Sequence, residues 1–91
     1  MKNTKTSTTS IGTTIKYATA TREQLIEIIA EEHGIEERLV TENFFEETDS
    51  LDRLAIQVQI ENEFNIVFED EELNKDTTIT ELLELVNNKL K

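Results

Sequence analysis

The chain has 91 residues, 36% of them hydrophobic, which suffices for one small core and leaves little room for the enclosed cleft of an enzyme. It has no cysteine and one histidine, which excludes a disulfide framework, a thiolate metal site and a zinc centre. The net charge of −11 repels phosphate backbones and anionic lipid, so we expect neither nucleic acid nor a membrane as partner. The absence of proline and the abundance of Glu and Leu predict an all-α fold.

Residues 1–20 differ in composition from the rest of the chain. They hold seven threonines, two serines and scattered lysines, with no acid and too few apolar residues to fold, so we predict a flexible tail. An organelle transit peptide would also fit this charge, but arginine is scarce and no amphipathic pattern is evident, so we expect a cytoplasmic protein. Residues 23–91 hold 20 acidic and five basic residues, a balance that attracts basic protein surfaces.

The ends of a first helix are marked in the sequence. Thr21 followed three residues later by Gln24 is a capping-box pattern, and Gly34 supplies the left-handed residue with which helices often end. The helix is therefore expected to run to about His33. The apolar residues at helical spacing within it, which we place in the core, are Leu25, Ile28 and Ile29.

The next apolar residues, between positions 35 and 45, predict a loop packed against the domain. Thr78 with Glu81 repeats the capping-box pattern and predicts a final helix of about three turns. Its core residues are Leu82 and Val86. Residues 68–76, FEDEELNKD, predict a short helical turn; they lack the alternation and central glycine of an EF-hand loop, so a solvated acidic turn is favoured over a calcium site.

Two apolar stripes run along residues 49–64. Alternation after Ala55 allows a β-hairpin, but its turn would have no glycine, and Asp49 with Asp52 makes a helix start, so we favour a helix. On a helical wheel one stripe contains Leu51, Leu54, Ala55 and Val58, and the opposite stripe contains Ile56, Ile60 and Phe64. One stripe can enter so small a core, and the other is either covered by the loop or exposed for binding.

The sequence Asp49-Ser50-Leu51-Asp52 resembles the acyl carrier protein family, whose second helix begins with an Asp-Ser-Leu motif. IENEFNIVFEDEEL, residues 60–73, is similar to the acidic end of that helix and the short third helix that follows. TTITELLELV, residues 77–86, is similar to the family's closing helix. The resemblance covers about residues 21–90.

This resemblance implies a small four-helix bundle, with three main helices and a short third helix, in a carrier domain of residues 21–91. It implies that Ser50 carries a covalent 4′-phosphopantetheine arm that holds acyl groups as thioesters. The motif flanks are Asp49, Leu51 and Asp52, and the partner-binding face contains Leu54, Val58, Glu61 and Glu63. The stripe of Ile56, Ile60 and Phe64 matches the family's core positions.

The resemblance also implies a set of protein partners. A phosphopantetheinyl transferase would donate the arm from coenzyme A, so the chain needs no catalytic residue and no metal ligand of its own. A ketosynthase, an acyltransferase or other acyl-processing enzymes with basic docking surfaces would then use the loaded chain. We expect a monomer that acts as a carrier and not as an enzyme.

Some positions depart from the family's pattern. Many carriers place Leu-Gly shortly before the motif, whereas here Thr48 leads directly into Asp49 without a glycine. Ala55 stands where fatty-acid carriers commonly have an acid, Arg53 adds a positive charge, and Gln57 stands beside the core stripe. Two pathways therefore stay open: a specialised one, with a polyketide or another acyl or aminoacyl cargo, and fatty-acid synthesis.

A function without the arm is the alternative to a carrier. An acidic helical module could bind a partner protein through Leu51, Leu54 and Val58, with Ser50 merely following an Asp cap. Addition of one phosphopantetheine group to the chain would separate the two functions.

Overall fold

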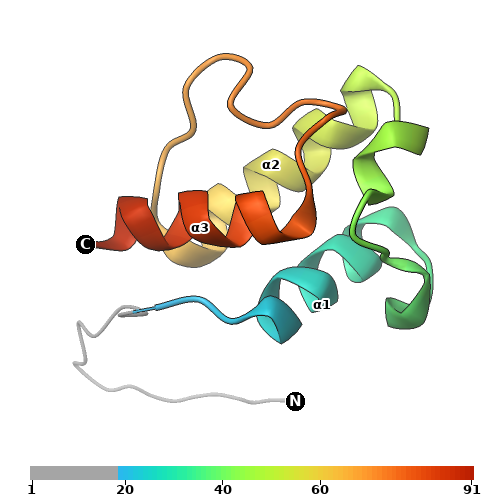
Figure 1. Cartoon of the computed structure of the whole chain (residues 1–91), viewed down its shortest axis with the longest axis horizontal. Coiled ribbons are helices and arrows are strands. Elements are labelled where there is room, and N and C mark those ends of the chain that lie inside the picture. The colour runs from blue at the N-terminus through green and yellow to red at the C-terminus, as the bar shows by residue number, and fades with distance from the viewer. Residues whose placement is uncertain (1–18) are drawn as a thin grey trace.

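The computed structural model describes residues 19–91, so the predicted tail lies outside the described residues except for its last two. Three α-helices form the domain (Figure 1): α1 (Arg22–His33), α2 (Ser50–Phe64) and α3 (Ile79–Leu90). Two 3₁₀ helices, η2 (Glu37–Leu39) and η3 (Phe44–Glu47), lie between α1 and α2. Residues 19–91 contain no strand, so the all-α class is confirmed and the hairpin reading of α2 is wrong.

The predicted helix ends are present. The Thr21 hydroxyl accepts a hydrogen bond from the Gln24 N–H at 3.2 Å, and the Gln24 side chain accepts one from the Thr21 N–H at 2.9 Å. Thr78 and Glu81 form the same reciprocal pair at the start of α3. Gly34 ends α1 with φ of 74°, and its N–H bonds to the Ala30 carbonyl. The local sequence therefore decides where α1 begins and ends and where α3 begins.

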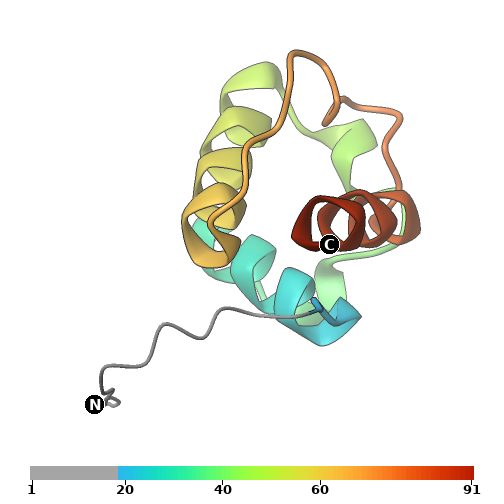
Figure 2. The same cartoon turned by 90° about the vertical axis from the view of Figure 1, so that its left-hand side faces the viewer.

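The core lies among the three helices. Helix α1 contacts both α2 and α3, and Figure 2 shows the three helices around the centre, with η3 and the loop after α2 on the remaining side. Seven of the eight residues expected in the core are buried: Leu25, Ile29, Ile56, Ile60, Phe64, Leu82 and Val86. Ile28 is only half-buried and packs against this core from its edge. Phe45 of η3 is fully buried as well, so the connection before α2 is anchored in the core.

The short third helix expected in residues 68–76 is absent, and a turn stands in its place. Glu71 adopts a left-handed conformation with φ of 66°, which a helix cannot include. The Glu69 and Asn74 N–H groups bond to the side chains of Glu72 and Thr77, at 2.8 and 3.0 Å. Side-chain acceptors thus replace the carbonyls of a helix, and four consecutive acids would also repel one another on a helical turn.

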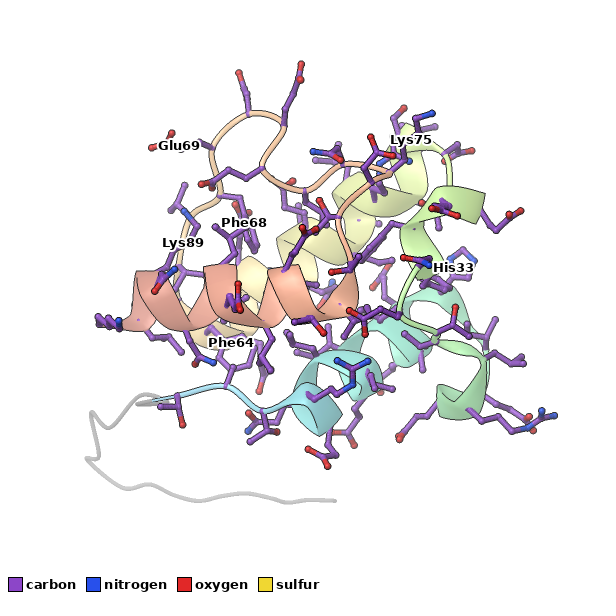
Figure 3. The ribbon with its side chains drawn as sticks, viewed as in Figure 1. His33, Phe64, Phe68, Glu69, Lys75 and Lys89 are labelled. Carbon is purple, nitrogen blue, oxygen red and sulfur yellow. The ribbon has the colours of Figure 1, made fainter. Side chains whose placement is uncertain are left out.

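The acidic turn is tied to α3 near the end of the chain. The Lys89 ammonium lies 2.8 Å from a Glu72 carboxylate oxygen and 5.5 Å from the centre of the Phe68 ring (Figure 3). The bond from Lys89, followed by the bond from the Glu69 N–H, lowers the pKa of the Glu72 carboxyl. One lysine therefore holds both arms of the turn against α3.

Glu42 fixes the middle of the connection between α1 and α2. Its carbonyl accepts a hydrogen bond from the Ile79 N–H at 3.0 Å, and its carboxylate accepts one from the Thr80 N–H at 2.7 Å. The same carboxylate pairs with Arg22 at the start of α1. Hydrogen bonds from Thr80 and then Arg22 lower the pKa of Glu42 from 4.5 to about 2. Glu42 therefore links the first turns of α1 and α3.

The packed part of the chain includes Ala20, which composition assigns to the tail. Ala20 is buried, its N–H bonds to the Asn87 side chain at 2.6 Å, and its carbonyl accepts a bond from the same amide at 3.2 Å. Composition could not reveal this contact, because Asn87 lies 67 residues away.

Within residues 19–91, no helix combines the length and apolar character that crossing a membrane requires.

Candidate functional site

Ser50 is the first residue of α2 and is exposed to solvent. Asp49 is the N-cap, and its carboxylate accepts a hydrogen bond from the Asp52 N–H at 2.9 Å. The helix start therefore does not depend on the serine hydroxyl. Among the described residues, no group forms a hydrogen bond with that hydroxyl, so it is accessible for covalent attachment.

The segment before Ser50 is fixed although it has no glycine. The Thr48 hydroxyl donates to the Phe45 carbonyl at 2.7 Å, and the Thr48 N–H bonds to the same carbonyl at 3.2 Å. Arg53 then donates from Nη1 to the Thr48 carbonyl at 2.7 Å. Because Phe45 is fully buried, these bonds connect the start of α2 to the core.

The two stripes of α2 have opposite environments. The exposed fractions of Leu51, Leu54 and Val58 are 73%, 52% and 40%. Those of Ile56, Ile60 and Phe64 are 0%, 0% and 2%. The first stripe is thus available to another protein, on the helix that begins with Ser50.

The two glutamates assigned to the same face differ in their contacts. Glu61 is half-buried, and its carboxylate accepts a hydrogen bond from the Phe68 N–H at 2.8 Å. Glu63 is exposed. Glu61 therefore helps to hold the loop that follows α2, a role that the sequence did not indicate.

An open groove of about 730 Å³ lies beside Ser50, between the start of α2 and the loop of residues 70–76. Its lining residues are Ser50, Leu51, Arg53, Leu54, Gln57, Asp70, Glu71, Leu73, Asn74, Lys75 and Asp76. Three of these are leucines and eight are polar or charged. The volume is typical of sites that bind small molecules, and the wall is more polar than in most of them.

The sequence did not associate the loop residues with this groove. Lys75 lies 25 positions after Ser50, and only the tertiary fold brings the two together. One signal was present, however, because Lys75 is the first basic residue after Arg53 in a strongly acidic stretch.

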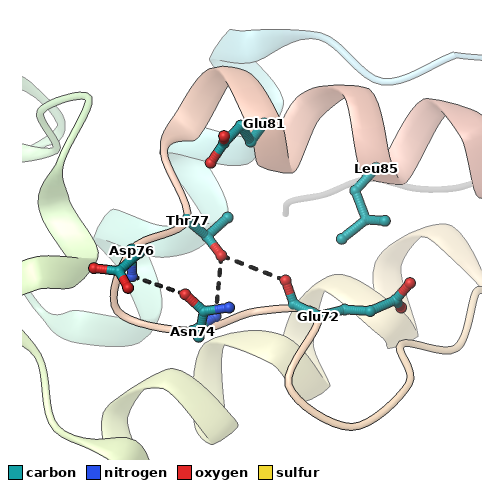
Figure 4. A pocket seen from close by; sticks show the side chains of 6 residues that line it. All are labelled: Glu72, Asn74, Asp76, Thr77, Glu81 and Leu85. Carbon is teal, nitrogen blue, oxygen red and sulfur yellow. Dashed lines mark hydrogen bonds between the residues drawn. The ribbon is translucent and has the colours of Figure 1, made fainter.

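A second groove, of about 390 Å³, lies between the loop and α3 (Figure 4). The Thr77 hydroxyl accepts from the Asn74 N–H at 3.0 Å and donates to the Glu72 carbonyl at 3.3 Å. The Asp76 N–H bonds to the Asn74 side chain at 2.8 Å. These bonds use the polar groups of the second groove to fix the turn. We therefore place the candidate site in the other groove, beside Ser50.

Within residues 19–91, no three His, Cys, Asp or Glu side chains are grouped to hold a metal ion.

Comparisons with known proteins cover most of the described residues, including α2. A family model described as a phosphopantetheine attachment site matches residues 23–86. An acyl carrier protein of Thermosynechococcus vestitus is 33% identical over 72 residues, a region that covers 75% of this chain and 89% of that protein. No solved structure matches the chain significantly.

Proposed function

Because the chain belongs to the acyl carrier protein family, we propose that Ser50 carries its 4′-phosphopantetheine arm. Family membership confirms the predictions that the chain is a carrier rather than an enzyme and that its cofactor is covalent 4′-phosphopantetheine. When attached, the arm supplies a thiol on which acyl groups are held as thioesters. Acyl-processing enzymes are therefore the general partners.

The exposed and unbonded hydroxyl of Ser50 is the observation that carries the proposal. A phosphodiester at this position would lie at the first turn of α2, where backbone N–H groups and the helix dipole favour negative charge. The groove that begins at Ser50 has room for the arm. Asp49 provides the cap, so the serine can be modified without loss of the helix start.

The exposed stripe of α2 is the proposed docking surface for the transferase and for the acyl-processing enzymes. Leu51, Leu54 and Val58 supply apolar contact, and the acidic balance of the chain suits a basic partner surface. Glu63 lies about 180° around the helix from Leu54, so it falls outside this stripe. An enzyme that docks here would meet Ser50 on the same helix, so recognition and attachment occur side by side.

A specialised pathway is the proposed setting. Gln57 is half-buried and lines the groove, and eight of its eleven lining residues are polar or charged. A half-buried amide still favours water or another polar partner, and a polar wall gives a long saturated chain little apolar surface. A short or polar acyl group, such as a polyketide intermediate, suits this groove better than a long fatty acid.

The attachment site can be tested by intact mass. Incubation with coenzyme A, magnesium and a broad-specificity phosphopantetheinyl transferase should add one phosphopantetheinyl group to the wild type and to Ser10→Ala, a control. Ser50→Ala should gain none. A wild-type chain that stays unmodified would instead favour an interaction module without the arm.

The cargo can be tested on the loaded protein. NMR spectra of chains that carry a long saturated acyl group or a short hydroxylated one should show that the long chain does not become enclosed among the helices. Efficient elongation by a general fatty-acid synthase set, with the long chain enclosed, would contradict the specialised role while leaving the attachment at Ser50 intact.

A further inference from the structure

The groove beside Ser50 contains two basic side chains in an otherwise acidic part of the chain. Residues 39–74 include eleven acids and a single base, Arg53. Lys75 is the next base, and it lines the same groove from the loop after α2 (Figure 3). Two cations from two separate elements therefore border the groove that begins at Ser50.

Arg53 is held in place before any ligand is bound. It follows Ser50 by three residues, so the two side chains are neighbours on one side of α2. Its Nη1 donates to the Thr48 carbonyl at 2.7 Å and to the Thr48 hydroxyl at 3.3 Å. Thr48 is itself bonded to the carbonyl of Phe45, a fully buried residue. The guanidinium thus has a defined position next to the Asp49-Ser50 pair.

The guanidinium has donors left for a second group. It carries five N–H bonds, and both contacts with Thr48 come from Nη1, so Nη2 and Nε remain for another acceptor. Their fork geometry matches two oxygens of a phosphate. The nearby carboxylates of Asp49 and Asp52 would repel an added anion. A cation at this place would offset that repulsion.

We propose that Arg53 binds the phosphodiester that joins the arm to Ser50, and that Lys75 is the second cation of this phosphate site. The inference rests on the proposed attachment at Ser50. The contact between Arg53 and the phosphodiester directs the first part of the arm into the groove between α2 and the 70–76 loop. It also offsets the repulsion between the phosphodiester and the acids around it.

The test compares the apo and holo forms of the full chain. Intact mass first reports whether the arm is present, which tests the attachment. In ¹H–¹⁵N NMR spectra the Arg53 Nε–Hε signal should shift between apo and holo wild type. The ³¹P signal of the holo phosphodiester should shift in Arg53→Gln, and by less in Lys75→Gln. Arg38→Gln is the matched control, because Arg38 of η2 pairs with Glu36, the residue before η2, and lies outside the groove.

A second comparison separates phosphate binding from a structural role. If Arg53 binds the phosphodiester, the change in melting temperature from apo to holo will be less favourable in Arg53→Gln than in the wild type. If Arg53→Gln lowers the melting temperature of the apo and holo forms equally and leaves the ³¹P signal unchanged, Arg53 only holds Thr48 in place. That result would overturn the inference. A chain that gains the arm without any change at Arg53 Nε–Hε would overturn it too, and this last result needs no variant.

Discussion

The two apolar stripes of α2 are alike in composition and opposite in environment. Ile56, Ile60 and Phe64 are at most 2% exposed, whereas the exposed fractions of Leu51, Leu54 and Val58 range from 40% to 73%. The buried stripe is covered by α1 and by the rest of the core, and the other stripe faces solvent. A residue's contribution to stability on this helix is therefore set by what covers it and not by its own hydrophobicity. Substitutions on the two stripes should accordingly affect different measurements.

Truncation of the buried stripe should have the largest effect. Phe64→Ala removes a nearly fully buried aromatic ring and should lower the free energy of unfolding by about 3–5 kcal/mol, because transfer and cavity terms add. Urea denaturation checks this value. Val58→Ala, on the exposed stripe, is the control and should change it by about 0.5 kcal/mol or less. Similar losses for both variants would show that the stripes do not differ as described.

Substitution on the exposed stripe should act on docking. Leu54→Ala should weaken binding of the phosphopantetheinyl transferase by about 1–2 kcal/mol, or about 5- to 30-fold, because apolar contact at the centre of an interface is lost. The measurement is the KM for the apo protein, with the melting temperature as control. An unchanged KM would mean that this stripe is not the docking surface.

Removal of the Asp49 N-cap tests the start of α2, the helix that carries both stripes and begins at Ser50. Asp49→Ala should cost about 1 kcal/mol of stability, because the Asp52 N–H loses its side-chain acceptor. Asp49→Asn retains an acceptor and should cost much less. If thermal unfolding gives equal losses for both variants, the charge at this position matters more than the hydrogen bond.

A pH series changes charge while both apolar stripes of α2 stay unchanged. The pKa of Glu42 is about 2 in the folded chain and 4.5 ordinarily, so its stabilising contribution is present above pH 4.5 and is lost as the pH falls towards 2. Glu42→Gln should therefore be less stable than the wild type at neutral pH, and the difference should shrink through this window. A difference that stays constant down to pH 2 would contradict the lowered pKa.

Local patterns predicted the elements of this fold better than their packing. The capping boxes at Thr21 and Thr78, the stop at Gly34 and the cap at Asp49 each depend on residues within a few positions, and each is present. The prediction of a short third helix was wrong. In the acidic turn, side chains accept hydrogen bonds from the backbone N–H groups of Glu69 and Asn74, and Glu71 adopts a left-handed conformation.

Contacts between distant residues could not be read from the sequence. Asn87 with Ala20, Glu42 with Thr80 and the groove that joins Ser50 to Lys75 all require the tertiary arrangement. For the site, the resemblance indicated the serine and the stripe. The structure added that Arg53 is held by Thr48 and that Glu61 bonds to the loop.

The two hydrogen bonds between the Ala20 backbone and the Asn87 side chain affect how the domain can be attached to other molecules. They hold the chain that enters α1 beside the last turns of α3, so both ends of the described chain lie at one side of the molecule, while α2 begins at the other (Figure 1). A tether or an immobilising tag joined after Lys91 would thus lie away from Ser50. The domain could be fixed to a surface or fused within a larger assembly with its serine still facing outwards.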